Sequence, residues 1–211
     1  FGLIGSATME LFDALYDAKS IKFIDVRDEK TGTHMADGYA RASGKPGIII
    51  AGQNGPGATN LVTGVAQAKA AFSPVISIAG AISTEHEGKD AFQEVDQQSL
   101  FEPITKKTFT VRQTELIPIT LKKAFSLALT PRCGPVHLNF PRNILANVCK
   151  FDEIQKHEKK KLSSIDENDL INILKIINKA NRPVIIAGGG IKNSLSHETV
   201  LKISTHLNIP I

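Results

Sequence analysis

Residues 47–60 read GIIIAGQNGPGATN, an apolar run followed directly by a glycine-rich segment. Because the run does not alternate apolar and polar residues, it is typical of a parallel strand buried on both faces. Glycines after such a strand let the backbone approach a ligand, and the first turn of a following helix offers unpaired N–H groups. Ligands of open α/β sheets lie outside the carboxyl ends of the strands. This bend is therefore either a candidate ligand site or a tight structural turn.

Similar apolar runs alternate with segments of helical periodicity on both sides of this stretch. Short apolar runs occur at 21–26, 74–79, 108–111 and 135–140, and apolar residues at helical spacing occur at 9–16, 34–42, 58–71 and 115–129. Such alternation of strands and helices predicts an α/β fold with an open parallel sheet flanked by helices.

The chain changes character after residue 141, where apolar blocks give way to a charged segment. Four lysines and a glutamate lie within 156–161. We therefore predict a first domain at 1–147, a linker at 148–165 and the incomplete beginning of a second, Rossmann-like α/β domain at 166–211. In this second part, the sequence predicts a helix through 170–177, a strand at 182–187 and a further helix with Ser194 or Ser196 as N-cap.

Composition excludes several classes of function. The 211 residues carry a formal net charge of +4, but the one dense basic patch is interrupted by acidic residues, so no nucleic-acid partner is expected. No apolar run approaches the roughly 20 residues of a membrane span. The two cysteines are sixteen residues apart, and no His or Cys spacing is typical of a metal site, so no bound metal is expected. Without a visible targeting signal, we expect a cytoplasmic protein.

Glu29 is a second candidate for chemistry. It follows the apolar run 21–26, so we expect it at the carboxyl end of a strand. A carboxylate there is either a solvated loop residue or a buried acid that exchanges a proton near neutral pH. Spacing alone leaves both interpretations open.

Five segments, in the same order and at family spacing, resemble the pyrimidine-binding domain of thiamine-diphosphate enzymes of the acetolactate synthase type. They are FGLIG at 1–5, RDE to HMADGYAR at 27–41, GPGATN at 55–60, GKDAFQE at 88–94, and GPV to PR at 134–142. The resemblance covers residues 1–147, and the segment around 187–190 is similar to the opening of the family's central domain.

The resemblance implies that Glu29 is the catalytic acid. In the family, this acid hydrogen-bonds a ring nitrogen of the aminopyrimidine and favours the tautomer that takes the proton from the thiazolium C2. By the same resemblance, Glu29, Gly55, Pro56, Gly57 and Asn60 bind the cofactor.

Other positions are carried over from the family with an alternative for each. Phe92 and Gln93 resemble residues on the substrate side of the cofactor, with core packing as the alternative for Phe92. By the resemblance, Lys106 lies where the acetolactate synthases carry a channel lysine, with a solvated lysine as the alternative. His34, Asp37 and Arg41 are expected to orient their helix rather than to act chemically.

Two activities remain open. The first is acetolactate-synthase-like: pyruvate is decarboxylated and its two-carbon unit joins a second 2-keto acid to give 2-acetolactate. The second is sulfoacetaldehyde acetyltransferase-like: sulfoacetaldehyde and phosphate give acetyl phosphate and sulfite. The segments 4–7 and 53–57 are more similar to the latter, whereas 88–93 and 104–106 are more similar to the former. A non-catalytic binding or regulatory relative is the alternative of another class.

The resemblance also implies cofactors and partners. Thiamine diphosphate is expected, with Mg²⁺ bound by a domain absent from this chain, so the chain alone is predicted to be inactive. Sites of the family form between subunits, which implies a homodimer or homotetramer. FAD is compatible with the segment 187–190, but the sequence does not decide whether it binds.

Overall fold

The computed structural model of the protein describes residues 1–151, 165–194 and 196–211. Its contacts divide the chain into two compact units, residues 1–157 and 158–211. Most of the linker predicted at 148–165 lies outside the described residues.

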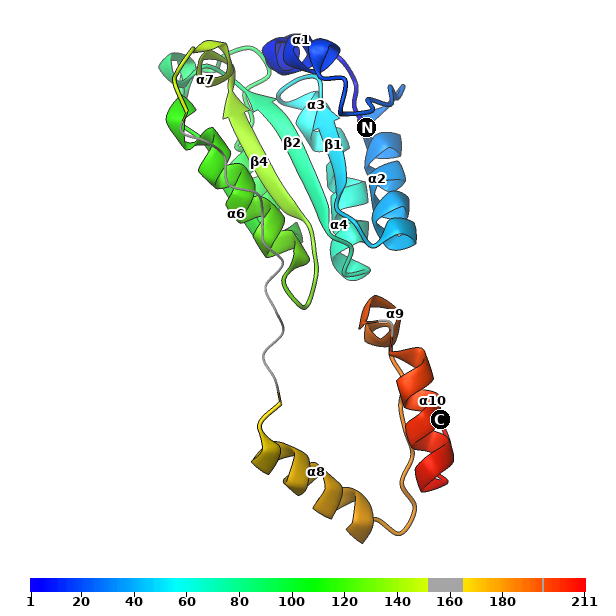
Figure 1. Ribbon diagram of the computed structural model, residues 1–211. Coiled ribbons are helices and arrows are strands. Elements are labelled where there is room, and N and C mark those ends of the chain that lie inside the picture. The colour runs from blue at the N-terminus through cyan, green and yellow to red at the C-terminus, as the bar shows by residue number, and fades with distance from the viewer. Residues whose placement is uncertain (152–164, 195) are drawn as a thin grey trace. The chain divides into compact units, whose positions relative to one another are not determined.

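The first unit is built on a parallel sheet of four strands in the order β1-β2-β4-β3. The strands are β1 (Gly47–Ala51), β2 (Val75–Ala81), β3 (Lys107–Thr110) and β4 (Val136–Pro141). β2 and β4 occupy the centre of the sheet, and every residue of β4 is buried. The prediction of an open parallel sheet is confirmed (Figure 1).

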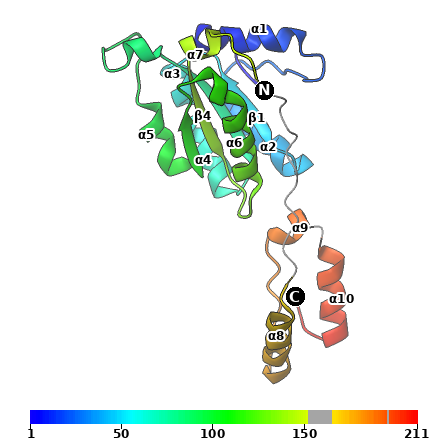
Figure 2. The same cartoon turned by 60° about the vertical axis from the view of Figure 1, so that its left-hand side comes forward.

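Helices cover both faces of this sheet, because successive strand residues point to opposite sides. Ile50, Ile76 and Leu138 belong to one apolar cluster, whereas Ile49 and Val75 belong to another. Figures 1 and 2 show α6 on one face, with α2 and α4 on the other. The α-helices of this unit are α1 (Met9–Asp17), α2 (Glu29–Ser43), α3 (Pro56–Asn60), α4 (Val62–Ala70), α5 (Gln97–Phe101), α6 (Ile117–Leu129) and α7 (Arg142–Ala146). Single 3-10 turns are η1 (Ser6–Thr8), η2 (Thr84–His86), η3 (Glu102–Ile104) and η4 (Thr114–Leu116).

The run at 21–26 does not form the expected strand. Only Asp25 makes a β-bridge, to Gly2. The N–H of Gly2 donates to the carbonyl of Ile24 at 3.1 Å, and the N–H of Val26 donates to the carbonyl of Gly2 at 3.0 Å. A strand needs a longer ladder of partners than this short segment provides.

Two predicted helices have different boundaries in the structure. The helix expected at 34–42 begins at Glu29, because the side chain of Asp28 caps it and accepts from the N–H of Thr31 at 3.0 Å. The helix expected at 58–71 is divided at Leu61 into α3 and α4.

The second unit contains α8 (Glu167–Lys179), α9 (Gly190–Ser194) and α10 (His197–Leu207). Residues 182–187 are not a strand here: the segment makes one hydrogen bond to another part of the unit, from the N–H of Ile185 to the carbonyl of Pro210 at 2.9 Å. Ser196 occupies the N-cap position of α10 without a side-chain capping bond. Among the described residues of the whole chain, no helix is long and apolar enough to cross a membrane.

The position of α2 depends on a close contact with α4. A Cβ atom on Gly64 of α4 would lie 2.5 Å from the Cβ of Thr33 on α2. Thr33 is fully buried, and its hydroxyl donates to the carbonyl of Glu29 at 2.7 Å. A methyl group at position 64 would therefore push on the first turns of α2. Gly38, on the exposed side of the same helix, has open space around its Cβ position.

Opposite effects are expected for two glycine-to-alanine substitutions. Gly64→Ala should lower the free energy of unfolding by about 1–3 kcal/mol through overpacking. Gly38→Ala should raise it by about 0.5–1 kcal/mol, since alanine is the better helix former. Urea denaturation of both variants checks this, and a shift of the same sign in both would contradict the contact described.

Candidate functional site

The carboxyl group of Glu29 is buried at the start of α2. Glu29 is 5% exposed, so the alternative of a solvated loop residue is wrong. Asn60 Nδ2 donates to Glu29 Oε2 at 3.0 Å. The unpaired N–H groups and the partial positive charge of a helix N-terminus favour a carboxylate at this position.

The glycine-rich bend after β1 passes directly against this carboxyl group. A Cβ atom on Gly57 would lie 3.1 Å from Glu29 Oε1, so glycine leaves room beside that oxygen. Gly55 has φ +53° and ψ −108°, and a Cβ on it would lie 2.4 Å from the carbonyl oxygen of Gln93. Pro56 begins α3, and Asn60 ends it. The structure thus brings Glu29 together with Gly57 and Asn60, two of the residues named from the sequence for cofactor binding, and places Gly55 and Pro56 in the same bend.

The loop that carries Phe92 and Gln93 rests on the same bend. Asn54 Nδ2 donates to the carbonyls of Phe92 and Gln93, at 3.0 Å each. Gln53 Nε2 donates to Gln93 Oε1 at 3.1 Å. The side chain of Phe92 is outside the core of this unit, because the residue is 79% exposed. The sequence analysis assigned no role to Asn54, which joins these two loops.

The carboxylate of Glu94 stabilises the turn of this loop by accepting hydrogen bonds from its backbone. It accepts from the N–H of Gly88 at 2.6 Å and from the N–H of Ala91 at 3.0 Å. These backbone hydrogen bonds lower the pKa of Glu94. Gly88, Asp90 and Gln93 all have positive φ angles, which is consistent with a tightly turned loop around an anion.

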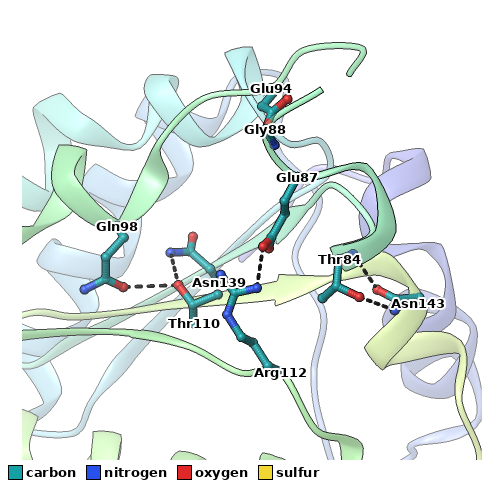
Figure 3. Close-up of polar contacts among 9 residues, drawn as sticks. All are labelled: Thr84, Glu87, Gly88, Glu94, Gln98, Thr110, Arg112, Asn139 and Asn143. Atoms are coloured by element: carbon teal, nitrogen blue, oxygen red, sulfur yellow. Dashed lines mark hydrogen bonds and ion pairs between the residues drawn. The ribbon is translucent and has the colours of Figure 1, made fainter. Parts of the chain in front are cut away.

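A cavity of about 240 Å³ lies beside the bend, at the carboxyl ends of β2, β3 and β4. An ion pair between Arg112 and Glu87 is part of its lining. Figure 3 shows this ion pair together with hydrogen bonds from Thr110 to Gln98 and between Thr84 and Asn143. These contacts fasten the segment after β2 to the segments that follow β3 and β4.

A histidine to which the sequence analysis assigned no role lies in the interior of the sheet. His137 is fully buried on β4 and stacks on Phe101, with ring centroids 3.6 Å apart. Its Nδ1 lies 2.8 Å from Ser77 Oγ, and its Nε2 lies 2.7 Å from Asn139 Oδ1. Burial lowers the pKa of His137 to about 3, so the ring is neutral at physiological pH.

The residues expected to orient α2 differ in their contacts and exposure: Asp37 and Arg41 bind each other, whereas His34 is exposed. Arg41 makes a bidentate contact with Asp37, with Nε–Oδ1 at 3.0 Å and Nη2–Oδ2 at 2.7 Å, and it also donates to Ser73. His34 is exposed. Within the part of the chain that the structure describes, no group of three or more His, Cys, Asp or Glu side chains could hold a metal ion.

Lys106 is exposed, which agrees with the expectation of a solvated lysine, and the channel role stays a prediction. The residue precedes β3, at the opposite edge of the sheet from the bend. Its ammonium group donates to the carbonyls of Leu127, Thr130 and Arg132, at 2.7, 2.9 and 2.9 Å. Desolvation lowers the pKa of Lys106. Lys106 therefore satisfies carbonyls at the carboxyl end of α6, where a cation is favoured.

Comparison with known proteins agrees with this geometry. Residues 1–100 match the family described as thiamine pyrophosphate enzyme, N-terminal TPP binding domain. The resemblance to thiamine pyrophosphate enzymes that the sequence predicted is confirmed over these residues.

Two relatives that match over the whole chain are named acetolactate synthase large subunits. The chain is 41% identical over 217 residues to a protein named probable acetolactate synthase large subunit from Methanococcus aeolicus, covering 100% of this chain and 36% of that protein. It is 36% identical over 216 residues to the acetolactate synthase isozyme 3 large subunit of Escherichia coli K12, covering 100% of this chain and 38% of the relative. The chain thus spans somewhat more than a third of the length of these relatives.

A solved structure supports the fold alone. The thiamine diphosphate-dependent 4-hydroxybenzoylformate decarboxylase of Rhodococcus jostii RHA1 matches with a TM-score of 0.89 at 20% identity, covering 100% of this chain and 40% of that one.

The contacts of Lys106 predict a stability difference between neighbouring lysines. Lys106→Met should lower the free energy of unfolding by about 1–3 kcal/mol, because carbonyls at the end of α6 lose their donor. Lys107→Met, at an exposed position at the start of β3, should change it by less than about 0.5 kcal/mol. Urea denaturation measures both, and equal effects would contradict the capping role.

The burial of His137 predicts a dependence of stability on pH. Between about pH 6.5 and the folded pKa of about 3, only the unfolded chain takes up the proton. The contribution of this group is therefore complete above about pH 6.5, and is lost by up to about 1.4 kcal/mol per pH unit as the pH falls. Histidine-selective NMR should find the folded ring of His137 neutral at about pH 4.5, with the urea-unfolded chain titrating near about 6.5. A folded-state midpoint close to the unfolded value would refute this.

Proposed function

We propose that this chain is the pyrimidine-binding part of a large subunit that transfers a two-carbon acyl unit, acetolactate-synthase-like in converting pyruvate to 2-acetolactate. The observation that carries the proposal is the carboxyl group of Glu29, buried beside Gly57 and held by Asn60. The names of relatives that match the whole chain favour this activity over others of the family.

The residues present fit the pyrimidine half of thiamine diphosphate. A carboxyl group can donate a proton to a ring nitrogen. Glu29 Oε1 lies next to Gly57, which has no side chain that could cover this oxygen. Gly55 and Gly57 keep the bend free of side chains that would crowd a flat ring. When bound, the cofactor supplies an electron sink for the carbon next to a carbonyl group.

In this proposal, the chain holds the carboxyl proton of Glu29 at a fixed place. Asn60 binds Oε2 and so fixes the rotation of the carboxyl group, which leaves Oε1 as the oxygen for the ring nitrogen. The protein around Glu29 excludes bulk water, which strengthens a hydrogen bond to a polar ring atom. We expect this bond to set the tautomer of the cofactor and thereby its reactivity.

Two parts of the proposal concern residues outside this chain. We propose that Mg²⁺ and the diphosphate group are held by another domain, and that the intact protein is a homo-oligomer. The chain alone is then expected to be inactive.

Glu29→Gln tests the proposed role in the intact protein that carries this chain. The amide is nearly the same size, so the fold should persist, but it cannot pass on a carboxyl proton. We expect turnover to fall by about 10²-fold or more, in the range typical of a lost acid–base group. Glu102→Gln, at an exposed position on η3, is the control and should leave the rate unchanged.

Turnover of a folded Glu29→Gln variant at the rate of the parent protein would remove Glu29 from the mechanism. A parent protein that binds thiamine diphosphate but turns over no substrate would favour the non-catalytic relative.

One observation keeps sulfoacetaldehyde acetyltransferase as a second candidate. The two segments more similar to that enzyme touch each other, since Ser6 Oγ donates to Gln53 Oε1 at 2.8 Å and the N–H of Ala7 donates to the same atom at 3.1 Å. They form one structural unit beside the bend. Assays of the intact protein with pyruvate alone and with sulfoacetaldehyde plus phosphate separate the two: acetolactate supports the first candidate, and acetyl phosphate with sulfite supports the second.

A further inference from the structure

A continuous series of buried hydrogen bonds connects the middle of the sheet to the bend beside Glu29. It runs from Ser77 on β2 to His137 and Asn139 on β4, then to Gln97 at the start of α5, and ends at the N–H of Gly55. Gln97 is 5% exposed, Asn139 is 2% exposed, and His137 and Ser77 are fully buried. The series therefore lies in a region where an unpaired polar group is costly.

The hydrogen bonds of the series converge on Asn139 Oδ1 from both ends. Asn139 Oδ1 accepts from Gln97 Nε2 at 2.7 Å and lies 2.7 Å from His137 Nε2. Because a carbonyl oxygen can only accept, His137 carries its proton on Nε2. Its Nδ1 then accepts from the hydroxyl of Ser77 at 2.8 Å. With the ring neutral, both nitrogens are used.

Gln97 is the member that reaches the bend. Its Nε2 donates to the carbonyl of Gly80 at 3.1 Å as well as to Asn139 Oδ1, so both hydrogens of the amide are engaged. Its Oε1 therefore faces Gly55 and accepts from that N–H at 3.4 Å. Turning the amide over would place an N–H group against the N–H of Gly55 and would remove the hydrogen bonds that Gln97 donates to Asn139 Oδ1 and to the carbonyl of Gly80.

The bend needs such a support because its glycines leave the backbone free to adopt other conformations. Gly55 has φ +53° and ψ −108°, a conformation outside the regions that L side chains adopt freely. Surrounding contacts must therefore select this conformation from the many that glycine allows. Gly57, two residues further on, is the residue that lies against Glu29 Oε1.

We propose that Gln97 and Asn139 are positioning residues, which hold the 55–57 bend against Glu29 and so set the shape of the pocket for the pyrimidine ring. This inference rests on the proposed function, because it takes thiamine diphosphate as the ligand. Neither residue touches the Glu29 carboxyl group in the contacts described; they act through the backbone of Gly55.

The test is Gln97→Met in the intact protein, with Gln98→Met as the matched control. Methionine keeps the length and much of the volume of glutamine but removes the amide. Gln98 is the next residue of α5 and accepts from Thr110 Oγ1 at 3.1 Å, but none of its hydrogen bonds reaches the bend. The probe is thiamine diphosphate with Mg²⁺, whose binding is measured by circular dichroism or by equilibrium dialysis.

Gln97→Met is expected to weaken thiamine diphosphate binding by about 10-fold or more, the effect of losing one well-placed interaction. It should also speed hydrogen exchange of the Gly55 amide. Gln98→Met should change both by less than about twofold. With Glu29 intact, turnover at saturating cofactor should fall less than the affinity does, which separates positioning from catalysis.

Asn139→Leu provides an independent route to the same result. It should weaken cofactor binding in the same direction, and its combination with Gln97→Met should cost less than the product of the two single effects, because both act through one series. Gln97→Asn, one methylene shorter, replaces Gln97→Met if the latter fails to fold.

The outcomes are distinguishable. A folded Gln97 variant with unchanged affinity and unchanged Gly55 exchange overturns the positioning role while the proposed function stands. A parent protein that does not bind thiamine diphosphate at all overturns the proposed function itself.

Discussion

The arrangement of the site depends on one contact, between the buried carboxyl group of Glu29 and the backbone at Gly57, which carries no side chain. Glu29 would be costly to bury alone. The N-terminus of α2 and the amide of Asn60 offset that cost. Gly57 then leaves room beside the other carboxyl oxygen, because a Cβ atom at this position would lie 3.1 Å from it. The placement of α2, which Gly64 sets by its contact with Thr33, is therefore a condition for the site as well as for the core.

The parallel sheet explains why residues far apart in the sequence meet at this site. All strands end at the same edge, so the segments after β1 and β2 lie together there. Asn54 and Gln93, thirty-nine residues apart, are joined by a hydrogen bond to a carbonyl. The family's reaction, as proposed for this chain, uses an edge that the fold provides before any ligand arrives.

Polar side chains inside the sheet have a role that an apolar core could not fill. Ser77, His137, Asn139 and Gln97 form a satisfied series, in which each donor has an acceptor. Such networks make one arrangement of the surrounding backbone much better than its neighbours, because a half-broken network is costly. At the opposite edge of the sheet, Lys106 likewise binds backbone groups, since it donates to three carbonyls at and after the end of α6.

The sequence by itself determined the open parallel α/β fold, the position of the bend at 55–57 and the resemblance to a family, because apolar periodicity and local motifs are properties of neighbouring residues. It could not determine that Glu29 is buried, since 29 and 57 meet only through the packing of α2 on the sheet. It misjudged the runs at 21–26 and 182–187, which do not form strands, and it did not reveal the carbonyl partners of Lys106. Hydrogen bonds between distant segments exist only after the layers have packed, so the tertiary structure alone decided them.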